Sequence, residues 1–235
     1  MFGAHKAPYR ISKEELILSI NKIEGGLRYG RVCREEEMEK IVSTREASVH
    51  IDPVEPLNLP QHISTFLLIE FDNPLLVEPK GRHKIFLKFP VEMAVYIVRK
   101  KDFRVIDIFS LIKPKYILYN TLQEGPICRH WRSGAYLKMP AVDKYSEGVM
   151  LLDVVNTSTQ WIEVSRAVFN AVGMKIYYGP KMVSLKARMS LTGPKTAETD
   201  FIDAPFKKGM VKARELFTAR KLGLKTTKFI MEGGL

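Results

Sequence analysis

The chain has few residues of the kinds that indicate covalent cross-links or a membrane span. Its 235 residues include two cysteines, Cys33 and Cys128, which lie far apart. A chain of this length can bury a core without cross-links, so we expect reduced thiols. The longest apolar runs have the length of a strand and fall well short of the ~20 residues of a transmembrane helix. We therefore expect no membrane span, and a cytoplasmic location because no apolar stretch of signal-peptide length lies near the N-terminus.

Catalytic motifs are also missing. The sequence has no nucleophile elbow, no glycine-rich phosphate loop, no paired CxxC and no HExxH, and these are the local patterns that carry the commonest hydrolytic, nucleotide-binding and zinc chemistry. Because these motifs are missing, the sequence favours a protein that is not an enzyme, and we expect no cofactor. Amides are scarce as well, with three Gln and six Asn beside 37 basic and 26 acidic residues. This balance is typical of proteins from hot environments.

One strand-length segment occurs twice. Residues 67–73 and residues 150–156 match position by position. Any two half-buried strands resemble each other through their apolar and polar alternation. That alternation does not explain why Glu70 and Asp153, and the final asparagine of each segment, fall in register. The sequence therefore predicts a duplicated β-rich unit with a core in each copy.

The remaining pattern predicts an all-β fold. Strands of five to eight residues alternate with turns every eight to twelve residues, which is typical of an antiparallel sandwich. We expect two tandem antiparallel β-sandwich units with one short C-terminal helix. Residues 1–46 should form N-terminal strands that pack on the first unit, residues 47–122 the first sandwich, and residues 123–235 the second sandwich with a basic helix and a last strand.

Two segments are expected to lie outside the strands. Six of the seven residues at 34–40 are charged, which is typical of a solvated loop. Residues 52–60 carry three prolines, which fix φ and remove three amide donors, so an extended connector at a sheet edge is expected. A proline-rich ligand for an aromatic groove is the alternative interpretation.

The C-terminal region concentrates the positive charge. Residues 204–235 supply +6 of the net +11. Residues 209–220 are the one helix candidate, since apolar residues recur there at helical spacing and Gly223 stands where a C-terminal cap belongs. Positive charge at this density attracts nucleic acid, anionic lipid or acidic proteins, although a merely solvated face is the alternative. The candidate contact residues are Lys207, Lys208, Lys212, Arg214, Arg220 and Lys221, with an outward strip of Lys186 and Arg188.

The one local cluster of reactive residue types is residues 127–134. On a strand, Cys128, His130 and Arg132 share one face, and Arg129 lies on the other. We hypothesise an anion site made by Arg129, His130 and Arg132, because three cationic or titratable groups lie within four residues. A soft-metal or catalytic site near Cys128 and His130 is an alternative that requires further ligands from elsewhere in the chain. The structural interpretation is a buried cysteine in a strand.

Four stretches together resemble an archaeal family of uncharacterised proteins, the domain of unknown function numbered 432. They are residues 53–60, residues 77–79 with 86–92, residues 125–132 and residues 228–234. The resemblance runs along nearly the whole chain and implies an archaeal source. It brings no established activity, so it assigns no catalytic residue.

Three functions remain open from the sequence. The first is a non-catalytic binding protein that offers sheet faces, edges and a groove to a protein partner, by analogy with other sandwiches. The second is a basic protein that binds nucleic acid or another anionic surface. The third is an enzyme or metal protein with its site near Cys128 and His130. The sequence does not identify the partner or the oligomeric state.

Overall fold

The computed structural model describes residues 2–44, 48–60, 63–99, 102–120, 125–216 and 228–230. These residues form 19 β-strands arranged in four sheets and contain no helix. The all-β prediction is therefore confirmed for the described part of the chain. No helix with the length and apolar character needed to cross a bilayer occurs in that part.

Sheet B is a meander of four consecutive antiparallel strands: β2 (Tyr9–Lys13), β3 (Leu16–Ile23), β4 (Gly26–Cys33) and β5 (Glu36–Ser43). Tight turns connect them, and Gly25 and Arg34 adopt the positive φ values that such turns require (74° and 55°). Residues 34–40, predicted to be a solvated loop, instead supply most of β5.

Sheet A lies beside sheet B. Its strand order is β1 (Gly3–His5), β6 (Ser48–Val54), β9 (Glu92–Arg99) and β10 (Asp102–Phe109), with every pair antiparallel. Apolar side chains of the two sheets form one core, which includes Leu18, Tyr29, Ile51, Val95 and Phe109. We call these two sheets the A/B pair.

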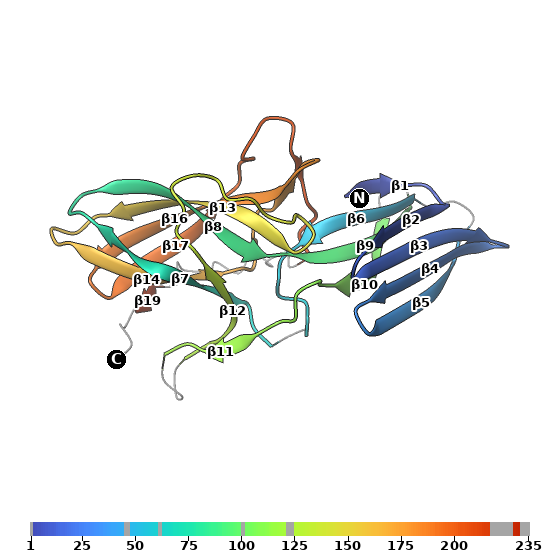
Figure 1. Cartoon of the computed structure of the whole chain (residues 1–235), viewed down its shortest axis with the longest axis horizontal. Coiled ribbons are helices and arrows are strands. Elements are labelled where there is room, and N and C mark those ends of the chain that lie inside the picture. The colour runs from blue at the N-terminus through green and yellow to red at the C-terminus, as the bar shows by residue number, and fades with distance from the viewer. Residues whose placement is uncertain are drawn as a thin grey trace.

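Sheets C and D share a second and larger core, and we call them the C/D pair. Sheet C has the order β11 (Tyr116–Leu118), β12 (Ile127–Ser133), β7 (Phe66–Val77) and β14 (Ile162–Asn170). Sheet D has the order β18 (Val211–Lys212), β15 (Tyr177–Tyr178), β16 (Val183–Gly193), β13 (Glu147–Asn156) and β8 (Arg82–Pro90), while β17 (Thr196–Ile202) joins β16 to β19 (Lys228–Ile230). The A/B pair and the C/D pair lie end to end along the long axis of the molecule (Figure 1).

The two copies of the repeated segment occupy equivalent places in the C/D pair. The segment at residues 67–73 lies in β7, and the segment at residues 150–156 lies in β13. β7 has β12 as a parallel neighbour and β14 as an antiparallel one; β13 has β16 as a parallel neighbour and β8 as an antiparallel one. Consecutive strands β7 and β8 thus enter different sheets, as do β13 and β14, and the two strand pairs interlock.

This arrangement differs from the tandem one that the repeat predicts. Phe71 and Leu152, one residue from each copy, lie in the single C/D core together with Phe89 and Phe169. The sheets also do not follow the predicted boundaries at residues 46 and 122, because β6 and β9 belong to the A/B pair while β7 and β8 belong to the C/D pair. Apolar alternation determines which face of a strand is buried, and it does not determine which strand lies next to it.

The predicted C-terminal helix is not present in the residues that can be checked. Within residues 209–216 the chain forms strand β18 followed by irregular structure. β18 pairs with the short strand β15, so its backbone hydrogen bonds go to a sheet edge. The remainder of the predicted helix, residues 217–220, lies outside the described residues.

Candidate functional site

Strand β12 separates the three residues of the predicted anion site. Arg129 is paired in register with Leu67, which faces the C/D core, whereas His130 and Arg132 lie on the opposite face, in register with Leu68 and Glu70. The face assignment made from the sequence is therefore confirmed. The same alternation prevents the three side chains from converging on one ligand.

Each of the three side chains also has its own carboxylate. Arg129 Nη1 lies 3.7 Å from Glu92 Oε1 in a fully buried pair. His130 Nε2 lies 2.8 Å from Glu70 Oε2, and this hydrogen bond lowers the pKa of Glu70. Arg132 Nη2 lies 3.4 Å from Asp72 Oδ1 at the exposed surface. These charges are compensated within the fold, which leaves little excess positive charge at β12 for an anion.

Cys128 lies on the same face of β12 as His130 but packs among apolar side chains, including Leu68, Tyr119 and Val168. Burial raises the pKa of its thiol to about 12. A protonated thiol is a poor nucleophile and a poor metal ligand. The described residues contain no group of three or more His, Cys, Asp or Glu side chains that could hold a metal ion.

A buried polar cluster lies where the chain passes between the A/B pair and the C/D pair. Residues 53–58, expected to be a connector at a sheet edge, are buried. Glu92 Oε2 accepts a hydrogen bond from the backbone N–H of Asn58 at 2.9 Å, and the Asn58 side chain donates to the carbonyl of Glu55 at 2.6 Å. Glu55 Oε2 in turn accepts the N–H of Leu216 at 3.4 Å. We call Glu55, Asn58, Glu92 and Arg129 the polar junction.

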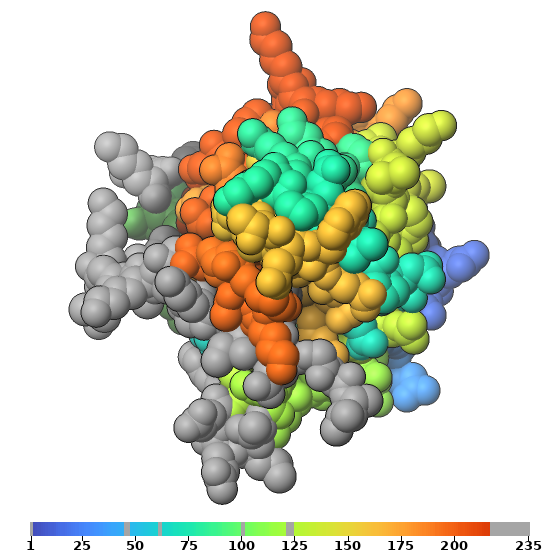
Figure 2. All heavy atoms as spheres, turned by 90° about the vertical axis from the view of Figure 1, so that its left-hand side faces the viewer, coloured from blue at the N-terminus to red at the C-terminus, as the bar shows by residue number. Residues whose placement is uncertain are grey.

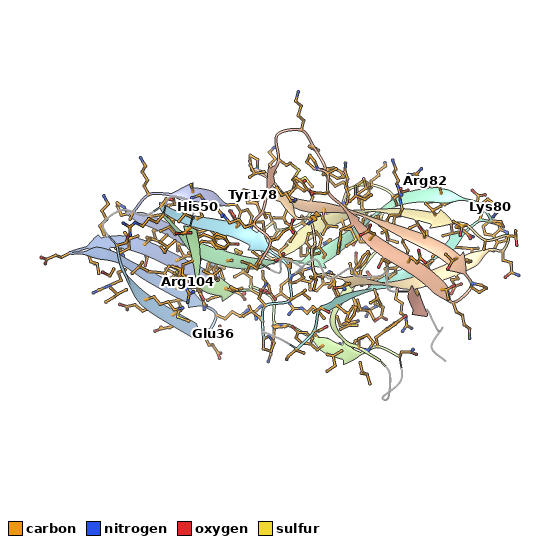
Figure 3. The ribbon with its side chains drawn as sticks, turned by 180° about the vertical axis from the view of Figure 1, so that it is seen from behind. Glu36, His50, Lys80, Arg82, Arg104 and Tyr178 are labelled. Atoms are coloured by element: carbon orange, nitrogen blue, oxygen red, sulfur yellow. The ribbon has the colours of Figure 1, made fainter. Side chains whose placement is uncertain are left out.

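Further polar side chains lie next to the polar junction. Asp52 is buried and lies close to Tyr178, which lies near the middle of the molecule where the two pairs meet (Figure 3). Arg214 lies near Asp52 and over the ring of Phe103, 4.8 Å from its centre. The segment before Leu216 therefore connects the edge of sheet D with the outer side of sheet A.

The two carboxyl groups of the polar junction are weaker acids than ordinary glutamates. Burial, with smaller contributions from the nearby carboxylates of Glu215 and Glu92, raises the pKa of Glu55 to about 7. Burial also raises the pKa of Glu92 to about 7, against the opposing effects of the Asn58 N–H and Arg129. Glu92 remains the partner of Arg129, because leaving a buried guanidinium without a carboxylate is costly. No cation lies within 4 Å of Glu55 among the described residues, so of these two carboxyl groups we expect Glu55 to titrate near neutral pH.

Sequence reasoning missed this cluster. Its one signal is Glu92, an acid inside the otherwise apolar run from Val91 to Val98. A charged residue in the middle of such a run requires a buried partner. The partner, Arg129, comes from a distant strand, and no local pattern identifies it.

The basic residues of the C-terminal region do not form one surface. Lys207 and Lys208 are exposed in the loop between β17 and β18. Lys212 contacts Asp203 at 2.7 Å and Glu215 at 3.2 Å. Arg214 lies against Phe103 as described above. Arg220 and Lys221 lie outside the described residues.

The positive charge of the Lys186/Arg188 strip on sheet D is partly compensated by neighbouring acids. In one row across the outer face, Lys84, Asp153, Arg188 and Asp200 lie side by side on adjacent strands. Asp153 accepts two hydrogen bonds from Arg82, at 2.8 and 2.6 Å, and lies 3.5 Å from Arg188. Alternating charges in adjacent strands stabilise a sheet face. The Lys186/Arg188 strip is thus only weakly cationic overall.

Three loops meet on the outer side of sheet D. Tyr136, in the loop of residues 134–146, exchanges two backbone hydrogen bonds with Phe86 of β8. The ring of Phe206, in the loop of residues 203–210, packs against the ring of Phe86 at 5.9 Å. Lys144 donates to the carbonyl of Pro180 in the hairpin of residues 179–182. Seen from the C/D end, the orange-red residues that follow β17 project furthest at the upper edge (Figure 2).

These loops carry an excess of lysine. Their lysines define what we call the basic loop surface: Lys138, Lys144, Lys181, Lys207 and Lys208. The loops contain two acids, and both contact lysines outside this set: Asp143 lies 3.8 Å from Lys13, and Asp203 lies 2.7 Å from Lys212. The five lysines therefore face no carboxylate of their own loops within 4 Å among the described residues.

Comparison with known proteins confirms the resemblance and adds no activity. A family model described as "Protein of unknown function (DUF432)" matches residues 1–232. No curated protein and no solved structure is significantly similar to the chain. The function must therefore be argued from the geometry.

Proposed function

We propose that this chain, which belongs to the DUF432 family, is a non-catalytic binding protein that holds an anionic partner against the basic loop surface. In this proposal the A/B and C/D pairs are two β-sandwiches that serve as rigid frames, and the loops of sheet D make the contact. An archaeal source, a hot habitat and a cytoplasmic location stay predictions from the sequence.

The observation that supports this proposal is that three loops which contact one another or the same residue, Phe86, carry five lysines, while the two loop aspartates pair elsewhere. Lysine side chains concentrated on one side of a protein attract polyanions and accelerate their association. Each lysine held near an anionic surface contributes about 1 kcal/mol at moderate ionic strength. Five such residues would together contribute about 5 kcal/mol, a contribution that salt weakens.

The proposal can be tested by reversing charge on the surface while matching the change in net charge elsewhere. The test variant is Lys138→Glu with Lys207→Glu and Lys208→Glu. The control carries Lys22→Glu, Lys113→Glu and Lys115→Glu, three lysines that are also exposed but lie outside the loops. Binding to labelled polyphosphate and to phosphatidylglycerol vesicles is measured at about 50 mM and about 300 mM salt.

We expect the test variant to lose binding by at least about 100-fold, and the control to lose only a small part. Binding of the wild type should fall steeply between the two salt concentrations. Equal losses in both variants would show that net charge alone drives binding, and would contradict a defined surface.

A further inference from the structure

We propose that the anionic partner is a lipid bilayer, and that Leu137 and Met139 insert into its interface while the surrounding lysines contact the headgroups. This inference rests on the proposed function, because it identifies the partner of the same surface. It follows from the apolar side chains that lie among the lysines.

The tip of the loop at residues 134–146 presents two apolar side chains to solvent. Leu137 is 80% exposed, the highest value among the exposed large apolar residues, and Met139 is 46% exposed. Lys138 lies between them, and the backbone bends at Leu137 and Lys138. A single exposed apolar residue is ordinary. Here two flank a lysine at an exposed bend, so that apolar and cationic groups are presented together, the combination by which peripheral proteins bind anionic bilayers.

The charges around this tip complement an anionic membrane. Lys138 belongs to the same loop, and Lys144 reaches the hairpin that carries Lys181. Lys207 and Lys208 come from the loop that contacts Phe86 beside Tyr136. Apolar insertion and headgroup attraction act together in peripheral proteins, since each alone gives weak binding.

The aromatic residues of the same loops favour lipid over single-stranded nucleic acid. A nucleic-acid platform presents ring faces on which bases stack. Phe206 packs edge-on against Phe86, and Phe86 is half-buried in the sheet. These rings are thus occupied with each other, whereas the side chains that remain exposed at the tip are aliphatic.

The experiment separates insertion from charge. Vesicles of phosphatidylcholine with and without phosphatidylglycerol are sedimented with the full chain, and polyphosphate and an oligothymidylate are used as lipid-free polyanions. The apolar variant is Leu137→Ser with Met139→Ser. Its control is Ile41→Ser with Leu76→Ser, two residues that are similarly exposed but lie outside the three loops. Thermal unfolding verifies that both variants fold.

We expect the apolar variant to bind phosphatidylglycerol vesicles about tenfold more weakly than the control, with polyphosphate binding unchanged. In a Leu137→Trp variant, the fluorescence of the new tryptophan should shift to shorter wavelength when these vesicles are added. The absence of that shift, or equal vesicle binding by the apolar variant and its control, would overturn insertion.

Two other outcomes distinguish this inference from the proposed function. If the wild type binds polyphosphate or oligothymidylate but not the anionic vesicles, the bilayer is excluded as the partner and the basic loop surface retains its role. If it binds none of these probes, both proposals fail.

Discussion

The A/B pair and the C/D pair are built from the same kind of strand but connected in different ways. Sheet B is a run of four consecutive hairpin-linked strands, so its pairing is local. At the centre of the C/D pair, β8 pairs with β13 and β7 with β14, and two further pairs are parallel. Each core has a buried ion pair beside it: Arg31 and Asp107 beside the A/B core, and Arg129 and Glu92 where the C/D pair meets the A/B pair. Similar strand patterns in one chain can therefore produce both local and interlocked sheets.

The largest loss of folding stability is expected when the buried ion pair between Arg31 and Asp107 is broken. A bulge in β10 after Val105 turns Asp107 inward, where its Oδ2 accepts hydrogen bonds from Tyr29 and Arg31, both at 2.6 Å. Asp107→Ala leaves the buried Arg31 without its closest carboxylate, so the free energy of unfolding should fall by about 3–5 kcal/mol. Denaturant unfolding measures this.

The control for this change is Asp72→Ala in the C/D pair, which removes the exposed partner of Arg132. It should cost less than about 1 kcal/mol. A similar cost for the two substitutions would mean that burial does not distinguish the ion pairs.

The next largest loss of stability is expected from a substitution that tests how tightly the C/D core is packed. Gly148 of β13 lies opposite Phe89 of β8, and a Cβ at Gly148 would lie 2.3 Å from the Phe89 ring. Gly148→Ala should therefore cost about 3 kcal/mol, because the ring cannot move within its core. In sheet B, a Cβ at Gly30 meets only the hydroxyl of Ser19, at 3.2 Å.

Gly30→Ala should consequently change the free energy of unfolding by less than about 1 kcal/mol. Both variants are compared by urea unfolding. If Gly30→Ala proved the more damaging, the C/D core would not be the more constrained one.

The polar junction between the two pairs should make stability depend on pH. The pKa of Glu55 is raised to about 7 in the folded protein, whereas an unfolded chain has the ordinary value near 4.3. A raised carboxyl pKa contributes stability that is fully present below the unfolded value and is lost as pH rises through the folded value. Stability should therefore fall between about pH 4.5 and pH 7.5, by roughly 2–3 kcal/mol for this group.

Glu55→Gln keeps the shape of the side chain and removes the proton equilibrium. Its unfolding midpoint, measured across this pH range, should vary less than that of the wild type. Glu14→Gln, at an exposed position in the turn between β2 and β3, is the control and should leave the pH dependence intact. An unchanged slope in Glu55→Gln would remove Glu55 as the titrating group.

The smallest changes in stability are expected at the equivalent acids of the two repeated segments. Asp153 and Glu70 occupy equivalent positions, yet the Asp153 side chain is 7% exposed and that of Glu70 is 47% exposed. The hydrogen bonds from Arg82 lower the pKa of Asp153, so its contribution is present above the unfolded pKa and is lost as pH falls. Asp153→Asn should cost about 1–2 kcal/mol at pH 7 and Glu70→Gln less than about 1 kcal/mol. Thermal unfolding at pH 7 and at pH 3 tests this, and the difference between the two variants should shrink at the lower pH.

Part of this fold can be predicted from the sequence because period-two alternation is a local property. It gives strands β3 and β4 of sheet B, the equivalence of the segments in β7 and β13, and the two faces of β12. It fails at β5, where charged residues such as Glu37 and Glu39 occupy an exposed face, while Met38 and Val42 pack against the core. An edge strand with one solvated face can carry as many charges as a loop.

The candidate sites depend on long-range pairing, which alternation does not specify. Glu92 meets Arg129 only because β9 and β12 come together at the junction. The basic loop surface combines loops from three parts of the chain, and the tail alone suggested only Lys207 and Lys208 of its five members. Lys212 and Arg214, which the charge count also selected, have local partners in the fold.

The interlocking of β7–β8 with β13–β14 has a consequence for biosynthesis. The last strand of the A/B pair ends at Phe109, so that pair has all its strands early. β7 and β8 leave the ribosome about 60 residues before β13, which at ordinary elongation rates is a delay of roughly 3–12 s. For the first part of that interval both strands have open edges and no partner in their final sheets, because β12, the parallel neighbour of β7, begins only at Ile127; β8 has no partner until β13 emerges. A nascent chain of this protein must pass through a stage in which one half is complete while the other exposes two apolar strands, and that stage is when misassembly or capture by a chaperone would occur.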